Sequence, residues 1–441
     1  MNESRAVMHF VRSARDRAAF QRCSPAGGER FVRVGTVDVG RARTLAMPQP
    51  AVDSIVLWTT ATLADESARA SPRTDAPATY KGCKPVFKSA VQKCVRRGMP
   101  DECAQFAWGL VHAGGLDQLL RRALVVIIED AVALPEVPVL IWLMAAHAKG
   151  FCLDADDIGL VVNAMYRAAA LPVRDCVPLP EPTVEARARL GAAANHPLVD
   201  AILLRVCYGG TPGDMRMLAR AASLWQARLH GTACTAWHDA WEAALVGTAM
   251  PVPVPPFTMG LDTPPPPDVM ASLVAAVPIE AADFHCFPHI CAEVAQAIRG
   301  LHTAEAVREA IWHHRSSVNL KRPWIDPATP ATLAPSTDAA ATAKWADDRV
   351  DSAALSRTAH CWTVVSAHVG RAARRAIDRV SVAVAHTADE PTELWHHTGQ
   401  KRSRAAAGID KRQPAAANKG QRALGPGQRS IESFFRPNAR S

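Results

Sequence analysis

The chain has 441 residues, of which 49% are hydrophobic and 21% are charged, and its formal net charge is +8. This length is enough for two or three domains, and the composition is ordinary for a soluble globular protein. No apolar run reaches the length of a membrane span, so we expect no membrane partner.

The N-terminal stretch from Met1 to Arg22 is rich in arginine and is predicted to form a plain helix. Two strands are predicted next, because Phe31–Gly40 alternates apolar and polar residues and Ser54–Thr60 is β-branched and apolar. The polar segment Thr62–Tyr80 is predicted to be a linker.

A helical block follows. Pro85–Arg97 is predicted as an amphipathic helix ended by Gly98, and Asp101 is predicted to cap the next helix. Val137–Ala148 is apolar nearly all round, which indicates the buried helix of a bundle. Asp154 is predicted to cap another helix.

We therefore predict a mainly α protein, with a helical-bundle body, a small β-containing N-terminal segment and a disordered basic C-terminal tail. Eight prolines among residues 251–267 predict a hinge. The predicted domain order is 1–61 helix and β segment, 62–80 linker, 81–250 helical domain, 251–277 hinge, 278–398 second helical region and 399–441 tail.

The tail carries the charge excess of the chain. Residues 401–441 hold ten basic and two acidic residues, a difference of eight that equals the whole net charge. The body is therefore neutral overall, which argues against a large nonspecific DNA-binding face but not against a local patch; DNA contact is expected through the tail.

The segment Gln428–Phe435 reads Gln-Arg-Ser-Ile-Glu-Ser-Phe-Phe. It resembles the PCNA-interacting peptide (PIP box), in which a glutamine, an aliphatic residue and two aromatic residues dock on the sliding clamp of DNA replication. Gln428, Ile431, Phe434 and Phe435 occupy the four pattern positions. One helical turn places Ile431 beside both rings, which makes an apolar plug. The resemblance implies a PCNA-binding accessory protein of DNA replication or repair that also binds other replication proteins.

Two basic clusters precede this peptide and have the pattern of a two-part nuclear localisation signal. Their members are Lys401, Arg402, Arg404, Lys411 and Arg412. A solvated basic linker is the other interpretation. Eleven cysteines without a CxxC pair indicate an intracellular, reducing compartment. The basic clusters and the clamp-binding peptide together lead us to expect a nuclear protein or one at a replication site.

Two helical segments, Lys88–Gly98 and Leu119–Asp130, are similar to the C-terminal helical region of the replication-associated recombination (Werner-helicase-interacting) AAA+ proteins, where this region serves oligomerisation and packing. The chain has no Gly-x-x-x-x-Gly-Lys-Ser/Thr loop, so nucleotide hydrolysis is not implied. A generic helical bundle explains the same residues.

An alternative function is a metal-dependent nuclease. Asp38, in the strand-like Val37–Gly40, resembles the opening strand of RNase H-like resolvases, and Glu129, Asp348 and Asp351 are candidates for the remaining acids. Such carboxylates would hold Mg²⁺ for phosphodiester cleavage, whereas the accessory-protein interpretation needs no cofactor. The purely structural interpretation is that Asp38 ends a strand and that the other acidic residues cap helices.

The segment His285–Cys291 holds two histidines and two cysteines within seven residues. So short a segment cannot easily supply four zinc ligands, and no second Cys/His pair lies nearby. A partly buried helix start is the expectation, with zinc as the alternative.

Overall fold

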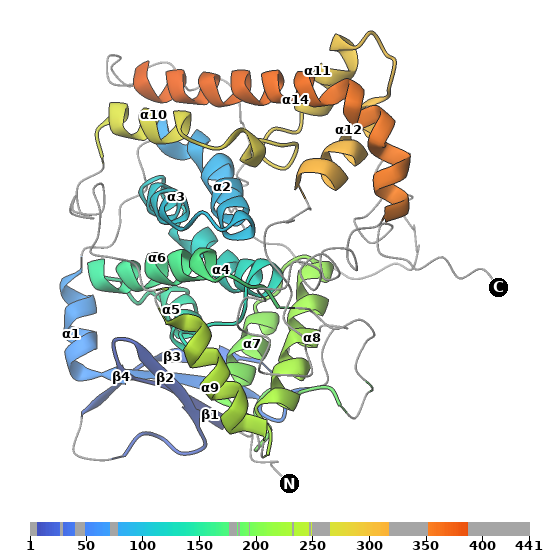
Figure 1. Cartoon of the computed structure of the whole chain (residues 1–441). Helices are drawn as coiled ribbons and strands as arrows, with labels where there is room; N and C mark the ends of the chain where they lie inside the picture. The colour runs from blue at the N-terminus through green and yellow to red at the C-terminus, as the bar shows by residue number, and fades with distance from the viewer. Residues whose placement is uncertain are drawn as a thin grey trace, which may run out of the picture. The chain divides into compact units, whose positions relative to one another are not determined.

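The computed structural model describes residues 7–26, 30–39, 49–70, 78–175, 183, 186–193, 195–231, 233–246, 248, 265–316 and 352–386. These described residues belong to one compact unit. The fold is mainly α with a small N-terminal sheet, as the sequence predicts (Figure 1).

The sheet has the strand order β2-β1-β4-β3. Its strands are β1 (Val7–Ala14), β2 (Arg17–Gln21), β3 (Phe31–Asp38) and β4 (Ser54–Thr60). β1 pairs antiparallel with β2 and parallel with β4, and β3 pairs antiparallel with β4. The two predicted strands are confirmed.

The predicted N-terminal helix is wrong, because the described part of Met1–Arg22 is the hairpin of β1 and β2. Its arginines are not one exposed basic stripe. The Arg12 side chain is fully buried, and its guanidinium donates to Asp157 at 2.5 Å, 145 residues away. Burial of an arginine requires an opposite charge, and here that charge lies 145 residues away. The sequence around Arg12 therefore does not show that this residue faces the core of a sheet.

The predicted linker 62–80 is also wrong over its first half. Residues Ala61–Arg69 form helix α1, and the Thr60 hydroxyl caps it by accepting from the Leu63 N–H at 3.3 Å. A 3₁₀ turn, η1 (Ala78–Cys83), then leads into the bundle. The Thr60 cap and the burial of Leu63 both favour a helix there.

The first helical group is close to the prediction. Its members are α2 (Lys84–Arg97), α3 (Pro100–His112), α4 (Leu116–Asp130), α5 (Val137–His147) and α6 (Ala155–Ala170). Gly98 ends α2 with φ of 68°, a left-handed conformation that glycine adopts without strain. Asp154 caps α6 as predicted, and α5 is buried all round.

α5 joins the bundle to the sheet. It contacts all four strands, and the Trp142 indole donates to the Phe10 carbonyl at 3.2 Å. Phe10 in turn stacks on Phe20 of β2, with ring centroids 3.8 Å apart. The inner face of the sheet therefore belongs to the same core as the helices.

The rest of the predicted helical domain 81–250 contains α7 (Pro197–Cys207), α8 (Pro212–Arg228) and α9 (Ala233–Leu245). Near α8, Arg228 makes a buried two-bond pair with Asp175 and lies over the rings of Trp225 and Trp237. Both tryptophans are core residues.

The second helical region packs directly on the first. It contains α10 (Pro267–Ala275), η2 (Ile279–Ala281), α11 (Ile290–Ala297), α12 (Ala304–Ile311), a π-turn η3 (Trp312–Ser316) and the long α14 (Ser352–His386). α10 occupies part of the predicted hinge, so that part is helical; the rest, 251–264, lies outside the described residues. In Figure 1 α10 runs along α14.

Hydrogen bonds tie the two regions together. The Tyr80 hydroxyl donates to the Pro265 carbonyl at 2.6 Å, and the Ser89 hydroxyl donates to the Ala281 carbonyl at 2.7 Å. No helix in the described ranges combines the length and apolarity needed to cross a bilayer.

Candidate functional site

Most of the predicted site residues lie outside the described part of the chain. This holds for the clamp-binding residues Gln428, Ile431, Phe434 and Phe435, for the basic clusters at 401–412, and for Asp348 and Asp351. Those assignments stay predictions from the sequence.

Asp38 and Glu129 are described, and they have different surroundings. Asp38 is the exposed last residue of β3, opposite Ser54 of β4. Glu129 lies near the end of α4, where its carboxylate accepts from Gln92 at 2.9 Å and from Arg96 at 3.2 Å. Burial and the neighbouring Asp130 raise the pKa of Glu129. No group of three His, Cys, Asp or Glu side chains in the described ranges is placed to hold a metal ion.

Glu129 belongs to a buried charged junction between α2, α4 and the second helical region. Arg96 donates two hydrogen bonds to Asp130, at 2.6 and 3.0 Å, and a further one to the Ser316 carbonyl at the end of η3. The segments Lys88–Gly98 and Leu119–Asp130 therefore face each other through this pair. Because both side chains are about 95% buried or more, the junction fixes how the helices pack.

Lys93 and Asp283 complete the junction. The Lys93 ammonium donates to the Ser316 carbonyl at 2.9 Å and lies 3.4 Å from Asp283. Burial, together with Arg96, lowers the pKa of Lys93 to about 8. Burial alone raises the pKa of Asp283, but hydrogen bonds and charges from His285, Lys93 and Ser316 outweigh it and lower that pKa. Each buried charge here has an opposite partner, and Lys93, Arg96, Asp130 and Asp283 are all shielded from solvent, so we assign the junction a structural role.

The histidine–cysteine segment is part of the same junction. The His285 Nδ1 lies 2.8 Å from Asp283, and the Cys286 thiol donates to the Ala281 carbonyl at 3.4 Å. Burial raises the pKa of Cys286 to about 12, which keeps it a thiol. Zinc binds the thiolate, so this environment favours the structural interpretation of the segment.

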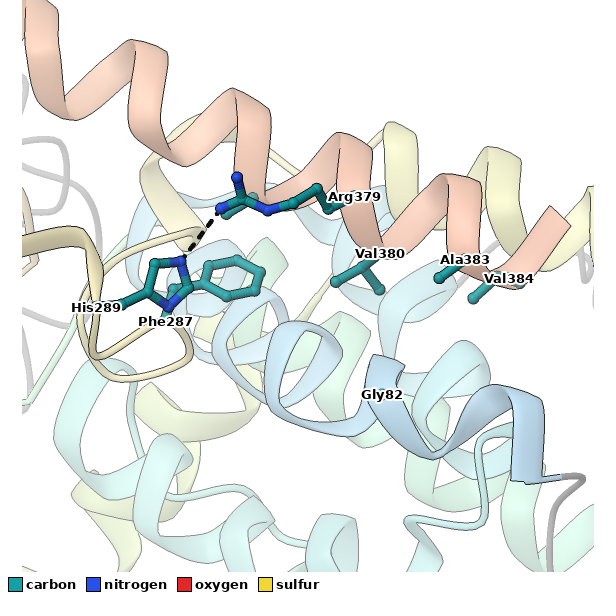
Figure 2. A pocket seen from close by; sticks show the side chains of 8 residues that line it. Gly82, Phe287, His289, Arg379, Val380, Ala383 and Val384 are labelled. Atoms are coloured by element: carbon teal, nitrogen blue, oxygen red, sulfur yellow. Dashed lines mark hydrogen bonds between the residues drawn. The ribbon is translucent and has the colours of Figure 1, made fainter. Parts of the chain in front are cut away.

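A shallow apolar groove of about 260 Å³ lies beside the last turns of α14 (Figure 2). Val380 and Val384 of α14 line one side, and Phe287 and Gly82 line the other. Its lining is brought together from three stretches of sequence about 90 to 300 residues apart, so no local motif could reveal it.

The groove has a basic rim. Arg379 donates to the His289 Nε2 at 3.3 Å across its edge, as Figure 2 shows. Arg375, one helical turn earlier, pairs with Glu293 of α11, and this hydrogen bond lowers the pKa of Glu293. Both arginines are more than half exposed. The arrangement suits a partner segment in which an apolar side chain lies next to a carboxylate. The spacing of Arg375 and Arg379 on one helix face is the one sequence signal of this site.

The chain was compared with protein-family models, with curated proteins and with solved structures, and none of them matches it.

Proposed function

We propose that this chain is a PCNA-binding accessory protein of DNA replication or repair, docked on the clamp through Gln428–Phe435. The observation that carries the proposal is the motif itself: Gln428, Ile431, Phe434 and Phe435 stand at all four positions of the pattern. The described body is mainly helical, and residues 387–427 connect it to the peptide along the chain.

The energetics of the peptide support docking of moderate strength. Burying one isoleucine and two phenylalanines contributes roughly 5–8 kcal/mol. Ordering the peptide costs several kcal/mol of this, which leaves an affinity in the micromolar range. Basic neighbours such as Arg429 and Arg436 strengthen the attraction to an acidic surface.

The body supplies a place for a further protein partner. The groove beside α14 joins an apolar floor to a basic rim, the chemistry that an acidic amphipathic segment of another replication or repair protein would meet. No observation in the described residues favours the nuclease alternative, since Glu129 is paired with Arg96.

The proposal is tested by calorimetric titration of the full chain into PCNA. We expect micromolar binding that Phe434→Ala with Phe435→Ala abolishes. The matched control is Ser430→Ala with Ser433→Ala, which alters the positions between the anchors and should leave the affinity within about threefold. Binding that survives loss of both rings would refute clamp docking through this peptide.

A further inference from the structure

The two faces of the N-terminal sheet differ in what covers them. The inner face, with Phe10, Ile55 and Leu57, packs on α5 and is completely buried. On the opposite face His9, Trp58 and Thr36 are half-buried and Arg33 and Gln21 are exposed, whereas Val11 is buried. The part of this outer face that carries His9, Trp58 and Arg33 is therefore accessible to a ligand.

The strand registers place these side chains in two rows across the outer face. Arg33 of β3 lies opposite Trp58 of β4, and Trp58 lies beside Val11 of β1. In the next row Thr36, Val56 and His9 follow one another, with Gln21 of β2 at the far edge. Because directly opposite residues project to the same side of a sheet, the outer face presents one tryptophan and one histidine at its centre and an arginine beside them.

Trp58 and His9 form a fixed pair. The Trp58 Nε1–H donates to the His9 Nδ1 at 2.9 Å, and the ring centroids are 6.1 Å apart with an interplanar angle of 44°. Burial lowers the pKa of His9, so the imidazole is neutral at physiological pH and remains an acceptor for the indole. The two rings are thus held in place before any ligand binds.

The charges around the rings are arranged unevenly. The Arg33 guanidinium donates to the Thr36 hydroxyl at 2.7 Å, which holds it over the same face. Asp38 lies on this face as well, opposite Ser54, at the other end of β3. An anionic backbone would therefore pass beside Arg33 and avoid Asp38.

We propose that the outer face of this sheet binds single-stranded nucleic acid, with bases stacked on Trp58 and His9 and a phosphate beside Arg33. Aromatic rings on an open sheet next to a cation are the features by which unpaired bases and their backbone are bound without sequence preference. A duplex has its bases stacked internally and offers none to these rings. The site does not depend on the clamp peptide, because its residues all belong to β1, β2, β3 and β4.

The test uses the full chain and a fluorescent twenty-nucleotide oligothymidine at low salt, followed by anisotropy. We expect Trp58→Ala to weaken binding about tenfold and Arg33→Glu to weaken it further with a smaller salt dependence. Asp38→Asn should strengthen binding. Trp362→Ala is the matched control: this half-buried tryptophan stacks on His314 of η3, and its loss should leave the affinity unchanged.

Three further measurements keep the outcome decisive. Trp58→Phe preserves a ring and should bind within about threefold of the wild type. Photo-crosslinking of the unaltered chain to the oligothymidine should label peptides that contain β1 or β4. The Phe434→Ala, Phe435→Ala variant should bind the oligonucleotide normally, which separates this site from clamp docking. Equal affinity in the wild type and Trp58→Ala, crosslinks confined to residues 401–441, or no binding at all would overturn the proposal.

Discussion

Two arginine–carboxylate pairs of this protein differ in burial: one lies in the interior and the other lies at the surface. At the junction of α2 and α4, Arg96 and Asp130 are paired through two hydrogen bonds, and both side chains are at most 5% exposed. At the rim of the α14 groove, Arg375 and Glu293 are also paired, but 52% and 29% of their side chains are exposed.

Burial decides what each pair does. The interior arginine cannot return to water, so loss of its partner leaves a buried cation without compensation. The rim arginines remain hydrated, and their pairs contribute little to folding. The rim pair is therefore free to exchange its carboxylate for one on a partner, whereas the junction is committed to the fold.

The largest effect that this comparison predicts is for Asp130→Ala. It leaves Arg96 buried with only the half-exposed Glu129 as its anionic partner on α4, and we expect a loss of about 3–5 kcal/mol in the free energy of unfolding. Denaturant titration measures it. The matched control on the same helix is Asp117→Ala, which breaks an exposed pair with Arg121 and should cost at most about 0.5 kcal/mol. Equal losses in the two variants would contradict the distinction drawn from burial.

A buried carboxylate that accepts its hydrogen bonds from neutral groups sharpens the comparison. Asp200 accepts from the Gly191 N–H at 2.9 Å and from Asn195 at 2.6 Å, and burial raises its pKa to about 6 from 3.8. The folded state therefore holds this proton more tightly than the unfolded chain. Its stabilising contribution is complete below about pH 4 and is lost as the pH rises through 6, a change of about 3 kcal/mol.

Asp200→Asn should remove this dependence. We expect the unfolding free energy of the variant to lose less between pH 4 and pH 6 than that of the wild type, as thermal or urea unfolding at several pH values would show. Identical slopes in the two proteins would mean that Asp200 does not titrate between these pH values.

The smallest effect is expected at the groove rim. Glu293→Ala releases Arg375 and Arg379, both exposed, so the unfolding free energy should change by less than about 1 kcal/mol. The melting temperature measures this directly. A loss as large as that of Asp130→Ala would mean that the rim pair is part of the core and not a surface for partners.

Local patterns predicted the elements that depend on local physics. The apolar run of α5, the Gly98 stop of α2 and the Asp154 cap of α6 each act within a few residues, and each is where the sequence places it. The strand β4 was recognisable for the same reason, from its β-branched run.

Contacts between distant residues are what the local patterns could not show. Arg12 was wrongly interpreted as part of a helix because its buried partner Asp157 lies far along the chain. Nothing local shows that Arg96 pairs with Glu129, the candidate metal ligand. The groove was missed since Gly82, Phe287 and Val380 meet only in the fold. In each case the deciding contact joins residues that are distant in sequence.

The central claim is that eight residues near the C-terminus dock this protein on the clamp. Its most direct test is fluorescence anisotropy of a labelled peptide spanning residues 424–441, titrated with PCNA. The account predicts saturable micromolar binding that the unlabelled full chain competes away and that alanine at Phe434 and Phe435 eliminates. A peptide that does not bind, or that binds equally well without the two rings, would contradict it.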